Sequence, residues 1–233
     1  MGVLGHALAS APLVLVVAAC GARAPIAYAP DAYEPRVPRG TTYRWSFDTA
    51  PPTPGTGQVS SSPERVFDAV LGGWGAHPDA DATSLPGVYR QDLRFGLLDT
   101  PRVLVRGLLF GDLDATVRCR ADSGIAAQGC GLVFDAHDSD RYFVARADAL
   151  EGVVRLLHVT GDGEQEVAHA AALVTPHVWH TLSVHARGEQ VLVEWDGQRL
   201  IAAIDWARDG GRIGLATVAD AVTSFDDFEV TAD

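Results

Sequence analysis

The stretch FVARADALEGVVRLL, residues Phe143–Leu157, decides the fold because it is compatible with two different structures. As one helix, it would present Glu151 as a candidate catalytic carboxylate. As two strands, it would leave Glu151 in a turn. From Tyr142 on, apolar and polar side chains alternate with a period of two, which places Tyr142, Val144, Arg146 and Asp148 on one face of a strand. The pattern predicts a β-hairpin with its turn at residues 149–152.

Outward from this hairpin, the rest of the chain shows the same alternation. In TYRWSF, the aromatic residues Tyr43, Trp45 and Phe47 share a face. Turn signals separate the short β-rich runs: Gly-Asp-Gly at 161–163, Arg187-Gly188, and Asp196-Gly197, a strong type I′ signal. Such turns, without helical stretches between them, predict an all-β fold of two antiparallel sheets packed as a sandwich.

The first residues resemble an export signal. Residues 7–19 are apolar but contain Pro12, and they are too few to span a bilayer. They end in small residues directly before Cys20, which resembles the lipobox of bacterial lipoproteins. We therefore expect a signal peptide over residues 1–19 and a lipid on Cys20. No Lys or Arg precedes the apolar run, so either the true start codon lies elsewhere or the signal is unusual. An ordinary secretory signal with a coincidental cysteine is the alternative.

Residues 20–40 are rich in Ala and Pro, a composition typical of an extended tether. Residues 41–233 have the length of a single domain with a core of its own. We expect the protein at the bacterial cell envelope, in the outer membrane or periplasm, held by its lipid; without the lipid it would be secreted.

The charge and composition exclude several functions. The formal net charge of the chain is −12. Residues 1–40 hold three arginines and two acidic residues, a net charge of +1, so residues 41–233 carry −13. An acidic surface repels phosphate backbones, which makes nucleic acid an unexpected partner. The chain has no lysine, which excludes a lysine nucleophile, and no asparagine, which excludes N-glycosylation.

Two cysteines remain after Cys20. Cys119 and Cys130 flank a turn-rich connection, and antiparallel neighbouring strands would bring them within reach of a disulfide. An oxidising compartment favours that bond.

Three stretches resemble a known superfamily: GLVFDAHDSDRYFVARADALEGVVRLLHVTGDGEQEVA, WHTLSVHARGEQVLVEWDGQRL and GRIGLATVADAVTSFDDFEV. They resemble the concanavalin A-like jelly rolls, and more closely the bacterial domains called DUF1080, or 3-keto-disaccharide hydrolase-like, often described as family 16 glycoside hydrolase-like. The Trp-His-x-Leu-x-Val run is also similar to laminin G-like modules. The resemblance implies pairing of the first and last strands, around Trp45 and Phe228, and a concave sheet face on which relatives bind glycans.

The chain departs from the family pattern at several positions. It has Asp135 where an arginine is usual, Arg141 where an asparagine is usual, and Ala216 and Val218 where a tryptophan and a lysine are usual. An enzymatic activity is therefore not carried over.

Catalytic residues are not assigned. Glycosidic cleavage needs two carboxylates flanking one bond. The nearest pairs are Glu194 with Asp196 and Glu164 with Glu166, and neither continues into the three-acid run of family 16. His177 and His180 point to opposite faces of a strand, and no Gly-x-Ser-x-Gly elbow is present.

A calcium loop is a weaker candidate, and no other cofactor is expected. Asp135, Asp138 and Asp140 lie in one short loop and offer hard oxygen ligands. The loop lacks the glycine and distal glutamate of recognised calcium loops, and turn aspartates often serve backbone hydrogen bonds instead.

The strongest polar cluster comes from the opening hairpin. Tyr142, Arg146 and Asp148 share a strand face, and Arg155 lies on the partner strand. Such groups suit sugar hydroxyls if the face is concave; an Arg–Asp ion pair on an exposed sheet is the alternative. We expect a carbohydrate-binding protein whose only membrane contact is its lipid. A hydrolase of the 3-keto-disaccharide type and a structural envelope protein are the alternatives.

Overall fold

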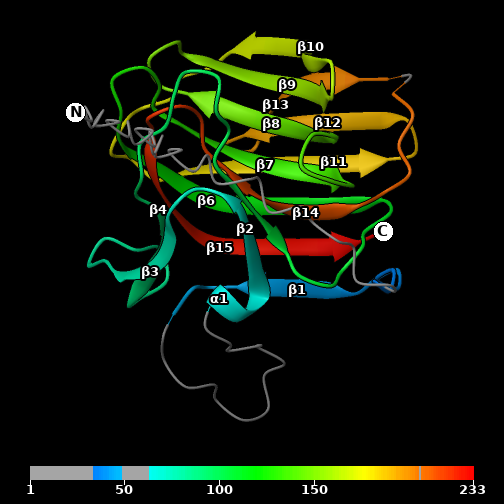
Figure 1. Cartoon of the computed structure of the whole chain (residues 1–233), viewed down its shortest axis with the longest axis horizontal. Coiled ribbons are helices and arrows are strands. Elements are labelled where there is room, and N and C mark those ends of the chain that lie inside the picture. The colour runs from blue at the N-terminus through cyan, green and yellow to red at the C-terminus, as the bar shows by residue number, and fades with distance from the viewer. Residues whose placement is uncertain (1–33, 49–62, 205) are drawn as a thin grey trace, which may run out of the picture.

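The computed structural model describes residues 34–48, 63–204 and 206–233 (Figure 1). The expected signal peptide, Cys20 and most of the expected tether lie outside these residues. Within the described ranges, no helix has the length and apolar composition of a bilayer span.

The described chain forms two antiparallel sheets that lie face to face, as predicted (Figure 1). Besides the strands, it contains one short helix, α1 (Pro63–Val66). The eight-stranded sheet has the order β13 (Gln198–Ala203), β12 (Gln190–Trp195), β11 (His180–Arg187), β6 (Leu113–Ser123), β15 (Val222–Ala232), β4 (Gly87–Gln91) and β3 (Trp74–Pro78), with β1 (Thr42–Trp45) also on β15. The seven-stranded sheet has the order β10 (Gly163–Ala171), β9 (Val153–Thr160), β8 (Tyr142–Asp148), β7 (Gly129–Ala136), β14 (Arg212–Ala216), β5 (Arg102–Val105) and β2 (Phe67–Leu71).

The opening stretch is the hairpin of β8 and β9. Its register pairs Tyr142 with Val159 and Arg146 with Arg155, and Glu151 lies in the connecting turn. Gly152 closes that turn at a φ of 64°, a conformation that glycine adopts without steric cost.

Two further features follow the sequence-based expectations. Asp196 and Gly197 join β12 to β13 with φ values of 50° and 76°, the positive pair that a type I′ turn requires. The first and last strands pair as the resemblance implied: Trp45 lies opposite Phe228, with ring centroids 5.1 Å apart.

The core lies between the sheets and is built from alternate residues of both. Cys119 on β6 and Cys130 on β7 form a disulfide inside it. We expected antiparallel neighbours to carry this bond, but β6 and β7 belong to different sheets. The bond therefore crosses the sandwich, because the chain passes from one sheet to the other between these two strands.

The packed part of the chain begins before residue 41, the boundary expected from composition. Val37 is buried in the core, and its backbone N–H donates to Leu109 O at 2.7 Å. Gly40 N donates to Ala232 O at 2.7 Å. Residues 36–40, expected as tether, thus lie against the sandwich because their backbone finds hydrogen-bond partners there.

Candidate functional site

The outer face of the seven-stranded sheet carries the cluster predicted from the hairpin. On β8, Phe143, Ala145 and Ala147 point into the core, so Tyr142, Arg146 and Asp148 point outward. Arg155 lies opposite Arg146 on β9. The four residues therefore share one face.

Beneath these polar groups, the face has an apolar floor that is separate from the main core. Its buried side chains come from five strands of the sheet: Leu104, Val133, Ala136, Tyr142, Val144, Leu157, Val159 and Ala216. An outer sheet face with so much buried apolar surface is unusual for a flat, solvated sheet, where polar residues prevail.

The sheet is curled around this face. Thr100, two residues before β5, donates through its hydroxyl to Glu164 Oε1 on β10 at 3.3 Å. Four strands separate β5 from β10, so five strand spacings would hold them roughly 24 Å apart in a flat sheet. The guanidinium of Arg102, on β5, also lies 4.6 Å from the ring centroid of Tyr142 on β8. These contacts indicate that the β5 edge and the segment before it curl over the outer face toward β8 and β10, which makes this face concave.

Two of the four predicted residues lie inside this hollow rather than at its surface. Tyr142 is 4% exposed and lies under the Arg102 guanidinium. Burial raises the pKa of its hydroxyl, although Arg102 opposes that rise. Asp148 is also buried, and its carboxylate accepts the Leu150 N–H at 2.8 Å. These two side chains shape the hairpin and the floor.

The other two form a partly exposed network with glutamates. Arg146 lies 3.6 Å from Glu164, and Arg155 Nε lies 3.1 Å from Glu166 and also contacts Glu151. We call Arg146, Arg155, Glu151, Glu164 and Glu166 the arginine–glutamate ladder. Its side chains are between 19% and 54% exposed. The Arg–Asp pair expected as the alternative is replaced by these Arg–Glu pairs.

Arg102 is a residue of this site that sequence reasoning missed. It is 7% exposed, it donates to the carbonyls of Thr100 and Ser139, and its Nε has no hydrogen-bond partner. Burial lowers its pKa, opposed by the nearby Tyr142 and Asp140. A buried donor without a partner costs about 1–3 kcal/mol. Arginine at the start of the apolar run RVLV was the only signal in the sequence.

No protein-family model matches the chain, and neither does any curated protein sequence. Solved structures do match. A carbohydrate-binding module, CBM66 from Bacillus subtilis, is 17% identical and superposes with a TM-score of 0.61 over 71% of this chain and 95% of that one. The fold is a jelly roll.

Two further structures share it. A Bacillus subtilis protein of unknown function with a galectin-like fold has 12% identity and a TM-score of 0.52 over 73% of this chain and 91% of its own. The Crh5 transglycosylase in complex with NAG has 12% identity and a TM-score of 0.54 over 82% and 83%. The three superpositions show a common architecture at low sequence identity. The specific likeness to DUF1080 stays a prediction.

The acidic residues of the two pairs weighed as catalytic candidates already have partners within the fold. Glu164 and Glu166 lie on the concave face, each beside an arginine of the ladder. A hydrogen bond from His169 lowers the pKa of Glu166, and Arg155 adds to this, whereas a general acid needs a raised pKa. Asp196, near the other sheet, accepts the Thr181 N–H at 2.8 Å and contacts His180. The geometry favours structural or binding roles for these acids.

The aspartates of the candidate calcium loop do not converge. Asp135 is buried and bound by Arg208 through contacts of 3.0 and 3.1 Å. Asp138 and Asp140 lie at the exposed loop, where the Asp138 side chain raises the pKa of Asp140. Within the described ranges, no three His, Cys, Asp or Glu side chains are grouped so that they could hold a metal ion.

Proposed function

We propose that this protein binds carbohydrate on the concave face of the seven-stranded sheet and does not cleave it. The observation that carries the proposal is the arginine–glutamate ladder along β8, β9 and β10. An arginine offers five donors and a carboxylate about four acceptor positions, so paired groups retain capacity for a ligand. Sugar hydroxyls donate and accept at once, which matches such alternating groups.

The architecture supports the same class of function. The superposable CBM66 is a carbohydrate-binding module, and its chain is covered almost completely by this one. A second candidate, a glycoside-acting hydrolase of the 3-keto-disaccharide type, draws on the transglycosylase with the same architecture and on the two acids of β10. The ion pairs of those acids favour binding over cleavage.

The binding experiment compares the protein with two variants against a panel of oligosaccharides and 3-keto sugars. A bound glycan raises the melting temperature of the native protein. Arg146→Gln removes the charge that faces Glu164, and we expect about a tenfold or greater loss of affinity, because hydrogen bonds to charged groups contribute about 1.5–3 kcal/mol. Arg199→Gln is the matched control, since Arg199 is 62% exposed on the eight-stranded sheet.

Each outcome decides something. If no sugar shifts the melting temperature, the proposal is wrong. A shift that Arg146→Gln leaves unchanged places the site elsewhere. If chromatography detects a cleavage product formed from a bound sugar, the protein is a hydrolase instead.

We also propose that the protein is exported and anchored through a lipid on Cys20. This rests on residues 17–20 alone, which lie outside the described residues. Replacement of Cys20 by serine should release the protein from the membrane fraction of an expressing bacterium; retention there would contradict the anchor.

A further inference from the structure

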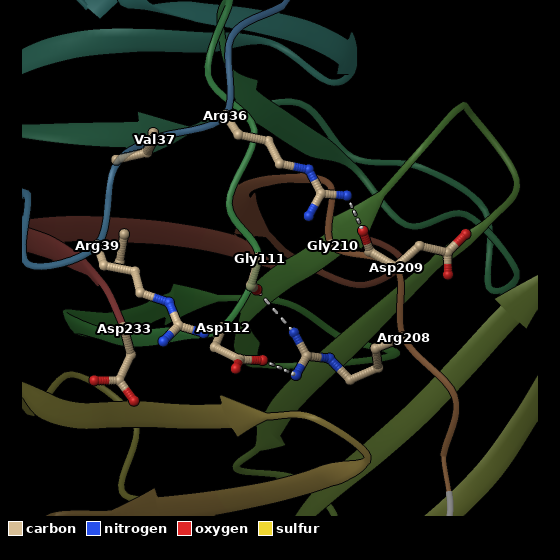
Figure 2. Close-up of a pocket in the computed structure, with 10 residues that line it drawn as sticks. Arg36, Val37, Arg39, Gly111, Asp112, Arg208, Asp209, Gly210 and Asp233 are labelled. Atoms are coloured by element: carbon tan, nitrogen blue, oxygen red, sulfur yellow. Dashed lines mark hydrogen bonds and ion pairs between the residues drawn. The ribbon is translucent and has the colours of Figure 1, made fainter.

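A cavity of 470 Å³ opens between segments that are far apart in the sequence (Figure 2). Its walls are the segment before β1, the residues before β6, the residues before β14 and the end of β15. The lining residues are Arg36, Val37, Arg39, Gly111, Asp112, Arg208, Asp209, Gly210, Ala232 and Asp233. It shares no residue with the arginine–glutamate ladder, and its volume falls in the range of about 300–1,000 Å³ typical of small-molecule sites.

One wall of the cavity is fixed. Arg208 is held by two contacts with buried Asp135, and it donates to Gly111 O at 3.0 Å (Figure 2). Asp112 accepts the Gly188 N–H at 2.8 Å. A ligand would therefore meet these groups already in place, which lowers the entropy cost of binding.

The opposite wall carries two arginines that lack a carboxylate partner. Arg36 donates to the backbone carbonyl of Asp209 at 2.7 Å, and the Asp209 carboxylate points away from it (Figure 2). In the described part of the chain, the exposed Arg39 guanidinium makes no hydrogen bond or ion pair. The acid at the end of β15, Asp233, is bound by Arg187.

We propose that this cavity binds a small ligand with a carboxylate and several hydroxyls, such as a hexuronate. A planar guanidinium binds a carboxylate through two parallel hydrogen bonds, so the exposed Arg39, whose guanidinium is directed into the cavity (Figure 2), would take the acid group. Free acceptor positions on Asp112 and neighbouring carbonyls would take hydroxyls. The site is separate from the ladder and does not depend on the function proposed there.

The experiment measures binding of D-glucuronate by calorimetry, with D-glucose as the uncharged analogue and acetate as the simple anion. We expect glucuronate to bind at least about tenfold more tightly than either, and its affinity to fall as salt rises from about 0.05 M to about 0.5 M. Arg39→Gln should lower glucuronate affinity about tenfold or more without loss of folding, because Arg39 holds no other group in place.

Two controls separate this site from the ladder. Arg199→Gln and Arg146→Gln should both retain glucuronate binding. The proposal is overturned if glucuronate does not bind, if glucose or acetate binds equally well, or if Arg39→Gln binds like the native protein. Loss through Arg146→Gln alone would move the acidic sugar to the ladder and likewise overturn it.

Discussion

His158, on β9, is an ionisable residue held among aromatic rings. It stacks on Phe143 with a centroid distance of 4.4 Å and meets Trp206 edge-on at 5.5 Å. Burial lowers the pKa of its imidazole, and the charge of Asp135 opposes this only in part. The folded protein thus prefers the neutral ring.

This preference predicts a pH dependence of stability. Below the unfolded value of about 6.5, the unfolded chain binds a proton at His158 that the folded chain rejects. Stability from this residue is therefore complete at neutral pH and is lost as pH falls through that window. Urea midpoints between about pH 7.5 and pH 5 should fall less steeply for His158→Phe, which keeps the stacking. Exposed His177→Gln should behave like the native protein; equal slopes for all three proteins would refute the assignment.

Among the elements, the turn between β12 and β13 depends on the backbone conformation of its glycine. Gly197 has a φ of 76° and open space around its missing Cβ. Gly161, in the turn between β9 and β10, has no left-handed φ, and a Cβ there would make only an ordinary contact with Asp140. The two glycines are therefore a matched pair.

We expect Gly197→Ala to lower the free energy of unfolding by about 1–2 kcal/mol, because only backbone strain is added. Gly161→Ala should leave it unchanged or raise it by up to about 1 kcal/mol. Denaturation in urea measures both. Equal effects of the two substitutions would contradict the type I′ geometry of residues 196 and 197.

The hairpins were predictable because the residues that determine each turn and strand are close together in the sequence. The alternation in β8 and the Asp-Gly dipeptide act over a few residues, and tertiary packing did not override them. The concave site was predictable only in part. Which side chains share its face follows from the strand period. The burial of Tyr142 under Arg102 does not, since it joins strands far apart in the sequence through the curl of the whole sheet.

At the scale of the whole molecule, the disulfide links the two layers of the sandwich. Cys119 lies on the eight-stranded sheet and Cys130 on the seven-stranded sheet, with a Cα separation of 6.3 Å. The bond restricts the unfolded chain over a short loop, which contributes about 3 kcal/mol. That is a large share of the stability of about 5–15 kcal/mol common to folded proteins.

Reduction with dithiothreitol should therefore lower the urea midpoint clearly, and the double variant Cys119→Ala, Cys130→Ala should show a similar loss without reductant. Reductant should have no effect on that variant. If the native protein melts identically in both conditions, the cystine contributes nothing and the sheets are held by packing alone.

The hydrogen bond from Gly40 to Ala232 places the packed segment before β1 beside the end of β15. The order of the strands along the polypeptide is therefore not the only one that can build this sandwich. A short linker could join Asp233 to Pro35, since Arg36 and Asp233 line the same cavity, and Val37 would stay in the core. New ends could be opened at the exposed turn of Gly188 and Glu189. Such a circular permutant would keep every strand pair and would open only the turn between β11 and β12. It would also move the point of attachment for any fused or anchored segment to a different part of the molecule.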